Sequence, residues 1–296
     1  MRGMKLHAFG YQVVDRGGFS WLANELGLRF ICEVDDWSPE TLVTRKGWSF
    51  WDKGSHALYV AQDYGQVRFL VKVYRARKSS AAFLTRQVNK AKQEFYNTLY
   101  AYEKGFNTVL PLALGESSWD RSSGVIVYPF LDNAIPLDKV YPYRGCGGLA
   151  IFERQYLEKS VGRLLRKCFE SGIFPANMCL GHFLARKEAG GRLVVYWVDF
   201  EKLKFRSLRR KRFGVKSLGK LLARIEWFRV SGGRINRSSI MRVGHACFHK
   251  EGSGKLDKKL CRAIIQAAKE YWEFRKIDTR GLYPLGSVQP VDQVTH

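Results

Sequence analysis

Residues 67–74 read Val67-Arg68-Phe69-Leu70-Val71-Lys72-Val73-Tyr74, a run rich in β-branched and aromatic residues. This composition is typical of a β-strand. Lys72 lies among apolar neighbours, and burying an ammonium group is costly unless a carboxylate neutralises it. Glu94, on the next predicted helix, could reach back to Lys72; the alternative is an ordinary lysine on a solvated face of the strand.

The residues on either side of this strand predict a β-rich lobe with one long helix. Apolar residues recur at helical spacing from Leu84 to Tyr102, with Ser79-Ser80 as the N-cap and Gly105 at the C-terminal end. Short apolar runs bounded by turn residues predict strands before and after this helix. These predicted strands are Thr41–Phe50, His56–Gln62, Val67–Arg75, Val109–Leu114 and Gly124–Phe130.

The second half of the sequence is mainly helical. A helical stripe from Ile151 to Phe169 ends at Ser171-Gly172, and a Gly190-Gly191 turn joins two further strands. The predicted strands are Phe183–Lys187 and Leu193–Val198, and the later helices are Ser217–Phe228 and Leu256–Phe274.

Together these patterns predict an α+β protein with a sheet-rich lobe, a helical lobe and a cleft between them. Leu131 to Pro136 lie between the two kinds of sequence and form the predicted hinge. The predicted division is residues 41–133 for the first lobe and 134–296 for the second, with residues 1–40 as an extension without an assigned role.

The chain has 296 residues, with 50 Lys and Arg against 27 Asp and Glu, so its formal net charge is +23. Such a charge favours polyanionic partners: nucleic acid, an acidic membrane surface or phosphorylated compounds. Eight cations fall within residues 202–216 without an acid: Lys202, Lys204, Arg206, Arg209, Arg210, Lys211, Arg212 and Lys216.

Two further features bear on location. The apolar runs are far shorter than the roughly 20 residues that span a bilayer, so we expect any membrane contact to be peripheral. Six scattered cysteines without a Cys-x-x-Cys pair predict free thiols in a reducing cytoplasm.

Three more positions have residue types suited to a nucleotide site. Asp199 follows the apolar run Val194–Val198, so its carboxylate would lie at a strand end, where it could bind Mg²⁺ or cap a turn. His182 directly precedes a predicted strand, although a lone histidine there is more often structural. Gly54 lies in a turn that could cover a nucleotide, but the sequence has no Gly-x-Gly-x-x-Gly and no Walker-type motif.

The order of these parts resembles the bacterial lipopolysaccharide kinase family, which includes core heptose kinases, Kdo kinases and InaA-type proteins and is related to the protein kinases. The resemblance extends from Gly47 to Arg224. It implies a protein-kinase-like bilobal fold that uses ATP and Mg²⁺. The best-matching stretches are Phe69–Arg75, Gly181–Arg186 and Val198–Lys202, followed by Arg206–Arg212.

The resemblance also implies a role for each matching residue. Lys72 would contact the α- and β-phosphates of ATP and pair with Glu94, and Asp199 would hold Mg²⁺. His182 stands where protein kinases have the asparagine of the catalytic loop, which makes it the second candidate metal ligand. The strand beside adenine would be Val127–Leu131, which contains Tyr128 and Phe130.

One position departs from the kinase pattern. The His-Arg-Asp of protein kinases falls on Pro175-Ala176-Asn177, so Asn177 stands in place of the catalytic aspartate. An amide cannot accept a proton, and loss of a general base typically costs about 10²–10⁴ in rate. Phosphoryl transfer nevertheless depends mainly on positioning and charge neutralisation, and Asn177 could still orient a hydroxyl group. InaA-type relatives also lack this aspartate.

Three functions from different classes remain open at this point. The first is a cytoplasmic ATP-dependent kinase of a lipopolysaccharide core sugar, heptose or Kdo, at the inner membrane, with an anionic glycan or lipid as partner. The second is an InaA-type pseudokinase with a regulatory or envelope-stress role. The third is a nucleic-acid-binding protein, which the charge and the aromatic content permit but which no recognisable binding motif supports.

Overall fold

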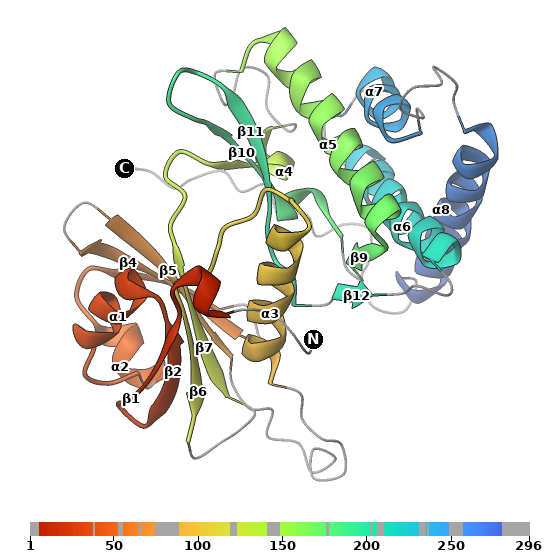
Figure 1. The fold of residues 1–296 in the computed structure, drawn as a ribbon. Helices are drawn as coiled ribbons and strands as arrows, with labels where there is room; N and C mark the ends of the chain where they lie inside the picture. Colours follow the sequence, from red (N-terminus) through yellow and green to blue (C-terminus); the bar gives the residue numbers. More distant parts are fainter. Residues whose placement is uncertain are drawn as a thin grey trace, which may run out of the picture.

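The computed structural model shows two lobes, one built on a large sheet and one mainly helical (Figure 1). The chain passes from the first lobe to the second through residues 130–134. This is the predicted α+β arrangement of a sheet-rich lobe and a helical lobe. The structure describes residues 6–37, 39–52, 56–64, 67–74, 89–118, 123–140, 149–175, 178–201, 203–205, 210–230, 235, 237–248 and 257–279.

The first lobe contains an antiparallel sheet of seven strands in the order β1-β2-β6-β7-β5-β4-β3. Helix α3 packs against one face of this sheet, and helices α1 and α2 pack against the other (Figure 1). The helices are α1 (Glu25–Cys32), α2 (Pro39–Thr44) and α3 (Lys90–Glu103), preceded by a short 3₁₀ turn at Leu6–Phe9. The strands are β1 (Gln12–Arg16), β2 (Phe19–Ala23), β3 (Trp48–Asp52), β4 (His56–Tyr64), β5 (Val67–Tyr74), β6 (Ala113–Ser117) and β7 (Gly124–Pro129).

Strand β5 supplies side chains to both faces of the sheet. Phe69, Val71 and Val73 pack into the apolar cluster beneath α1 and α2, whereas Tyr74 packs into the cluster beneath α3. Because side chains alternate along a strand, Lys72 lies on the same face as Tyr74. The strand therefore directs its one buried lysine towards α3.

Within the described residues, the second lobe contains five helices and two small sheets. Helix α5 packs against α7 and against strand β11, and α6 packs against α8. The sheets have the orders β11-β10-β8 and β12-β9. The helices are α4 (Leu137–Val140), α5 (Ile151–Ser171), α6 (Arg210–Val230), α7 (Arg237–Phe248) and α8 (Lys258–Thr279). The strands are β8 (Ile135–Pro136), β9 (Ile173–Pro175), β10 (Phe183–Lys187), β11 (Leu193–Trp197) and β12 (Leu203–Phe205), and a 3₁₀ turn covers Leu180–His182.

The sequence predictions for the centre of the second lobe are confirmed. Helix α5 ends at Gly172, which adopts the left-handed conformation with φ of 72°. Gly190 and Gly191 also have positive φ angles, 83° and 78°, and they form the turn between β10 and β11. Glycine avoids the steric cost that other residues pay in this conformation. Helix α7, in contrast, was not predicted.

Two predicted strands of the first lobe are corrected. The stretch Thr41–Phe50 contains the end of helix α2 and then strand β3. Its β-branched residues favour a strand, but Pro39 fits the first turn of a helix and Leu42 is fully buried in the core. The predicted strand Val109–Leu114 begins only at Ala113, because Pro111 has no N–H group for the ladder.

The start of α3 and the role of the N-terminal residues also differ from expectation. Helix α3 begins at Lys90, and its N-cap Asn89 accepts a hydrogen bond from the backbone N–H of Lys92 at 3.0 Å. The predicted cap at Ser79-Ser80 lies outside the described residues. Residues 12–23 form β1 and β2, and β2 pairs with β6. Part of the predicted extension thus belongs to the central sheet, a long-range pairing that local patterns cannot reveal.

Two findings bear on the predictions about location. No helix in the described part of the chain combines the length and the apolarity that crossing a membrane requires. The five cysteines within that part are free thiols.

Candidate active site

Four residues singled out in the sequence lie together between the lobes. Lys72 donates a hydrogen bond from Nζ to Glu94 Oε2 at 2.6 Å and a second to Asp199 Oδ1 at 3.2 Å. His182 Nε2 lies 3.2 Å from the other carboxylate oxygen of Asp199. Strand β5, helix α3, the turn before β10 and the segment after β11 each supply one of these side chains. The expected contact between Lys72 and Glu94 is therefore present.

The Glu94 carboxylate is only 2% exposed, yet three donors compensate its charge. Lys72 and the Tyr74 hydroxyl both donate to Oε2, and the Tyr128 hydroxyl donates to Oε1 at 3.0 Å. A buried carboxylate is tolerated when it is paired and hydrogen-bonded in this way. The two tyrosines fix Glu94, and with it α3, against the sheet.

The electrostatics keep Lys72 charged and both tyrosines protonated. Burial, the largest influence, lowers the pKa of Lys72, but Glu94 and Asp199 together outweigh it, so the net pKa is raised. Burial also raises the pKa of Tyr74 and of Tyr128, and the adjacent Glu94 carboxylate raises both further. The ammonium group and the two phenol donors thus persist at neutral pH.

Contacts on both sides of Asp199 hold its backbone in an uncommon conformation. Its φ angle is 67°, in the left-handed region that residues other than glycine rarely adopt. On one side, the Val198 N–H donates to the His182 carbonyl at 2.9 Å. On the other side, Asn97 Nδ2 donates to the Phe200 carbonyl at 2.8 Å. The surroundings therefore hold Asp199 in a conformation that costs energy, which is a common feature of functional sites.

Helix α3 positions this acidic segment directly. Glu94 binds Lys72, which in turn binds Asp199, and Asn97 donates to the Phe200 carbonyl. In addition, Lys90 forms an ion pair with Glu201 at 3.0 Å. One helix thus carries the partner of Lys72 and two anchors of the Asp199 segment.

The donor set around Asp199 fits a magnesium ion that is shared with phosphate groups. Mg²⁺ usually takes one or two carboxylates and completes its shell with water and substrate phosphates. The carboxylates of Glu94 and Asp199 both contact the Lys72 ammonium group. The Asp199 side chain is 36% exposed, whereas that of Lys72 is 7% exposed. His182 is the weaker candidate, because Mg²⁺ prefers oxygen to nitrogen. Within the described residues, no group of three or more His, Cys, Asp and Glu side chains is placed so that it could hold a metal ion.

The other predicted site residues have different placements. The Tyr128 side chain points to Glu94. The Arg68 guanidinium lies over the Phe130 ring, with its Cζ atom 4.6 Å from the centroid of the ring. Asn177 and Gly54 lie outside the described residues. The same holds for most side chains of the basic run, of which Arg212 and Lys216 are exposed.

Two residues that contribute to the site, Tyr74 and Asn97, were not among the predicted site residues. Tyr74 follows Lys72 by two residues, so strand alternation alone places both on one face. Asn97 follows Glu94 by three residues, which helical spacing places on the same side of α3. Both signals were available. The contact between Tyr128 and Glu94 could not be predicted in this way, because it depends on the pairing of β7 beside β5.

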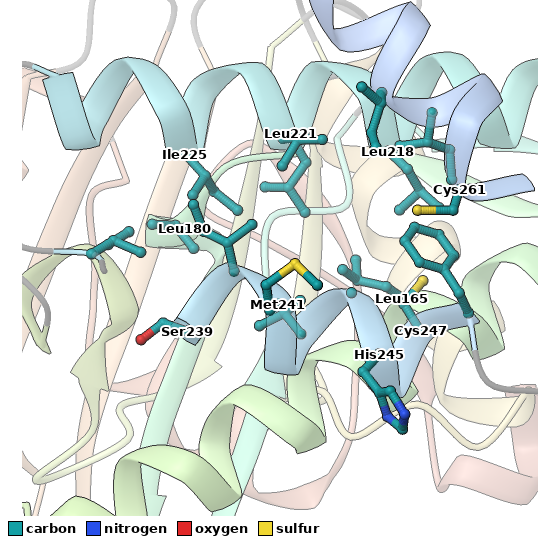
Figure 2. A pocket seen from close by; sticks show the side chains of 18 residues that line it. Leu165, Leu180, Leu218, Leu221, Ile225, Ser239, Met241, His245, Cys247 and Cys261 are labelled. Carbon is teal, nitrogen blue, oxygen red and sulfur yellow. The ribbon is translucent and has the colours of Figure 1, made fainter. Parts of the chain in front are cut away.

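A large apolar cavity lies apart from these residues. It has a volume of about 190 Å³ and is formed by side chains from α5, α6, α7 and α8 (Figure 2). Leucine, isoleucine, methionine and cysteine side chains dominate its lining, and His245 points away from the other labelled side chains (Figure 2). None of Lys72, Glu94, His182 and Asp199 lines it. Such a cavity offers nothing to neutralise a triphosphate.

Comparisons with known proteins agree with this geometry at the level of fold. No protein-family profile and no curated protein matches the sequence. Among solved structures, the chain is similar to WaaP in complex with acyl carrier protein, with 17% identity, a TM-score of 0.56, and coverage of 89% of this chain and 99% of that chain.

Two other solved kinases are similar at lower scores. The Rio2 kinase from Chaetomium thermophilum has 16% identity, a TM-score of 0.43, and coverage of 91% of this chain and 83% of that chain. The bifunctional kinase-methyltransferase WbdD has 15% identity, a TM-score of 0.41, and coverage of 75% and 51%. The similarity to WaaP extends over nearly the whole of both chains. The chain has the protein-kinase-like, bilobal fold that WaaP has.

Proposed function

We propose that this protein is an ATP-dependent phosphotransferase whose acceptor is a sugar of the lipopolysaccharide core, heptose or Kdo, at the cytoplasmic face of the inner membrane. The observation that carries the proposal is the position of Lys72, whose ammonium group joins Glu94 to Asp199 across the two lobes. A charged, rigidly held lysine beside an accessible carboxylate suits the phosphates of a nucleotide and their metal ion.

Each residue of the site has a part in this chemistry. Lys72 neutralises phosphate charge, and Glu94 with its two tyrosine donors keeps the lysine in place. Asp199 holds Mg²⁺, which when bound offsets the negative charge that develops on the transferred phosphoryl group. Asn177 occupies the sequence position of the kinase general base and would orient the acceptor hydroxyl without removing its proton.

The acceptor class rests on two supports. The fold is that of WaaP, a lipopolysaccharide core heptose kinase. The net charge of +23 suits an anionic glycan at an anionic membrane surface.

The test is transfer of radiolabelled phosphate from ATP to purified lipopolysaccharide core, with Mg²⁺ or Mn²⁺. We expect transfer by the natural protein and none above background by Lys72→Met. Lys92→Met is the matched control, because Lys92 lies on the exposed side of α3 and pairs with Glu116 at 2.9 Å. Equal signals from the natural protein and from Lys72→Met would contradict the proposal.

A second candidate function is favoured by Asn177 alone. In a pseudokinase of the InaA type, the same fold would serve a regulatory or envelope-stress role without catalysis. The variant Asn177→Asp separates the two functions. If the natural protein is inactive and this variant gains transfer, the pseudokinase is correct. If the natural protein transfers phosphate, the kinase is correct.

A further inference from the structure

A polar hollow lies on the side of helix α5, separate from the site described above. Its volume is about 400 Å³, and its walls come from the loop after α3, from α5 and from strand β11. Figure 1 shows α5 and β11 next to each other in the second lobe. None of Lys72, Glu94, His182 and Asp199 lines this hollow.

The lining carries three cations and no acidic side chain. Arg163 and Lys167 come from α5, and Arg192 directly precedes β11. Lys167 donates to the Gly105 carbonyl. The guanidinium groups of Arg163 and Arg192 are exposed and have no hydrogen bond or ion pair with any residue that the structure describes.

Two nearby arginines, one on α5 and one on the strand next to β11, are paired with acidic side chains. Arg166, three residues after Arg163, binds Glu170 at 2.7 Å. Arg186, on the strand paired with β11, lies 3.9 Å from Glu188. The nearby acidic side chains Glu170 and Glu188 thus pair with other arginines. Arg163 and Arg192 line the hollow with no acidic side chain beside them in the lining.

Uncharged hydrogen-bonding groups complete the lining. Tyr156 and Ser160 precede Arg163 on α5 by seven and three residues, and this spacing places all three on one face of the helix. Asn107 contributes an amide from the loop after α3. The side chains of Tyr156, Ser160 and Asn107 have no hydrogen-bond partner among the described residues.

We propose that this hollow binds the phosphate ester of a polyol, with Arg163, Lys167 and Arg192 around the phosphate and the hydroxyl and amide groups on the polyol. Guanidinium groups suit phosphate because they donate paired hydrogen bonds in a fixed geometry. The ligand could be a soluble sugar phosphate or the head group of an anionic phospholipid, since both present the same chemistry.

The position of the hollow connects it to both halves of the candidate active site. The loop after α3 follows the helix that carries Glu94, and β11 leads within two residues to Asp199. These two walls are joined directly, because the Trp197 N–H donates to the Asn107 carbonyl at 2.9 Å. A ligand in the hollow would contact both segments. The binding proposal itself does not depend on catalysis.

The test is isothermal titration calorimetry with glucose 6-phosphate, with glucose as the uncharged comparison. The double variant Arg163→Gln/Arg192→Gln removes both unpaired guanidinium groups at exposed positions. We expect it to weaken glucose 6-phosphate binding by at least about tenfold, since each charge-assisted hydrogen bond carries roughly that factor. Arg154→Gln is the matched control, because Arg154 is an exposed arginine on the opposite face of α5.

A second arm identifies the source of the phosphate. Co-sedimentation uses vesicles of phosphatidylcholine with and without phosphatidylglycerol. If the double variant loses glucose 6-phosphate binding, the site takes soluble esters. If it loses only the phosphatidylglycerol-dependent sedimentation, the site takes a lipid head group. Equal effects of the double variant and of Arg154→Gln, or no binding in either arm, would overturn the proposal.

Discussion

Two buried glutamates show how differently this molecule uses a buried charge. Glu94 is 2% exposed and Glu158 is 1% exposed, and each binds a cation from another element. Glu158 on α5 pairs with Arg242 on α7, which links two neighbouring helices of one lobe. Glu94 pairs with Lys72, and the same ammonium group continues to Asp199 in the other lobe.

The difference lies in what surrounds each pair. The Lys72 network ends at a carboxylate that is 36% exposed and is held at a φ angle of 67°. It also contains two tyrosine donors that fix Glu94. A buried ion pair alone is therefore weak support for chemistry. A buried pair that continues to a strained, accessible acid indicates a functional site.

The largest expected effect separates the two pairs by activity. Lys72→Met should lower phosphoryl transfer by about 10²–10³-fold or more, because it removes the charge that faces the phosphates. Arg242→Met should leave kcat within about twofold. It should instead lower the free energy of unfolding by about 2–3 kcal/mol, less than for a fully buried pair because the Arg242 side chain is 30% exposed.

The measurements are kcat for each purified variant and urea unfolding followed by circular dichroism. A loss of kcat in Arg242→Met as large as that in Lys72→Met would erase the distinction between the two pairs.

A smaller effect is expected from the tyrosine donors. Tyr128→Phe removes the hydrogen bond to Glu94 Oε1, which should cost about 1–2 kcal/mol of stability. It should also lower kcat about three- to tenfold, because Glu94 then holds Lys72 less rigidly. Tyr102→Phe is the control, since Tyr102 is 45% exposed at the far end of α3. Matching losses in both variants, measured by the transfer assay and by thermal unfolding, would show that Tyr128 does not act through Glu94.

The smallest effect concerns alkaline pH. The pKa values of Tyr74 and Tyr128 are raised in the folded protein, so above pH 10 the unfolded chain loses protons that the folded protein keeps. Stability should therefore fall as pH rises, by up to about 1.4 kcal/mol per pH unit for each tyrosine. Between pH 10 and 11, the free energy of unfolding of Tyr128→Phe should fall less steeply with pH than that of the natural protein, because one of the two tyrosines no longer contributes. Urea unfolding at several pH values measures it, and identical slopes would contradict the account.

The sequence could predict much of this network because its signals are local. The lysine among apolar residues of β5 suggested a buried acid, and Glu94 on the following helix is that acid. Tyr74 escaped notice although strand alternation places it beside Lys72. The glycines that end α5 and turn the β10–β11 hairpin also predicted those boundaries, since few other residues adopt their positive φ angles.

What the sequence could not predict depends on long-range pairing. Strand β2 joins the central sheet through β6, nearly a hundred residues away, and no periodicity within residues 1–40 reveals such a partner. The contact between Tyr128 and Glu94 likewise requires β7 to lie beside β5. The left-handed conformation of Asp199 arises from contacts on both sides of it rather than from its own preference.

The most direct test is a crystal structure of the protein with Mg²⁺ and a non-hydrolysable ATP analogue. We predict that the phosphates contact Lys72 Nζ and that the metal ion binds the Asp199 carboxylate. An analogue bound elsewhere, or a crevice between Lys72 and Asp199 that stays empty at saturating nucleotide, would contradict the central claim.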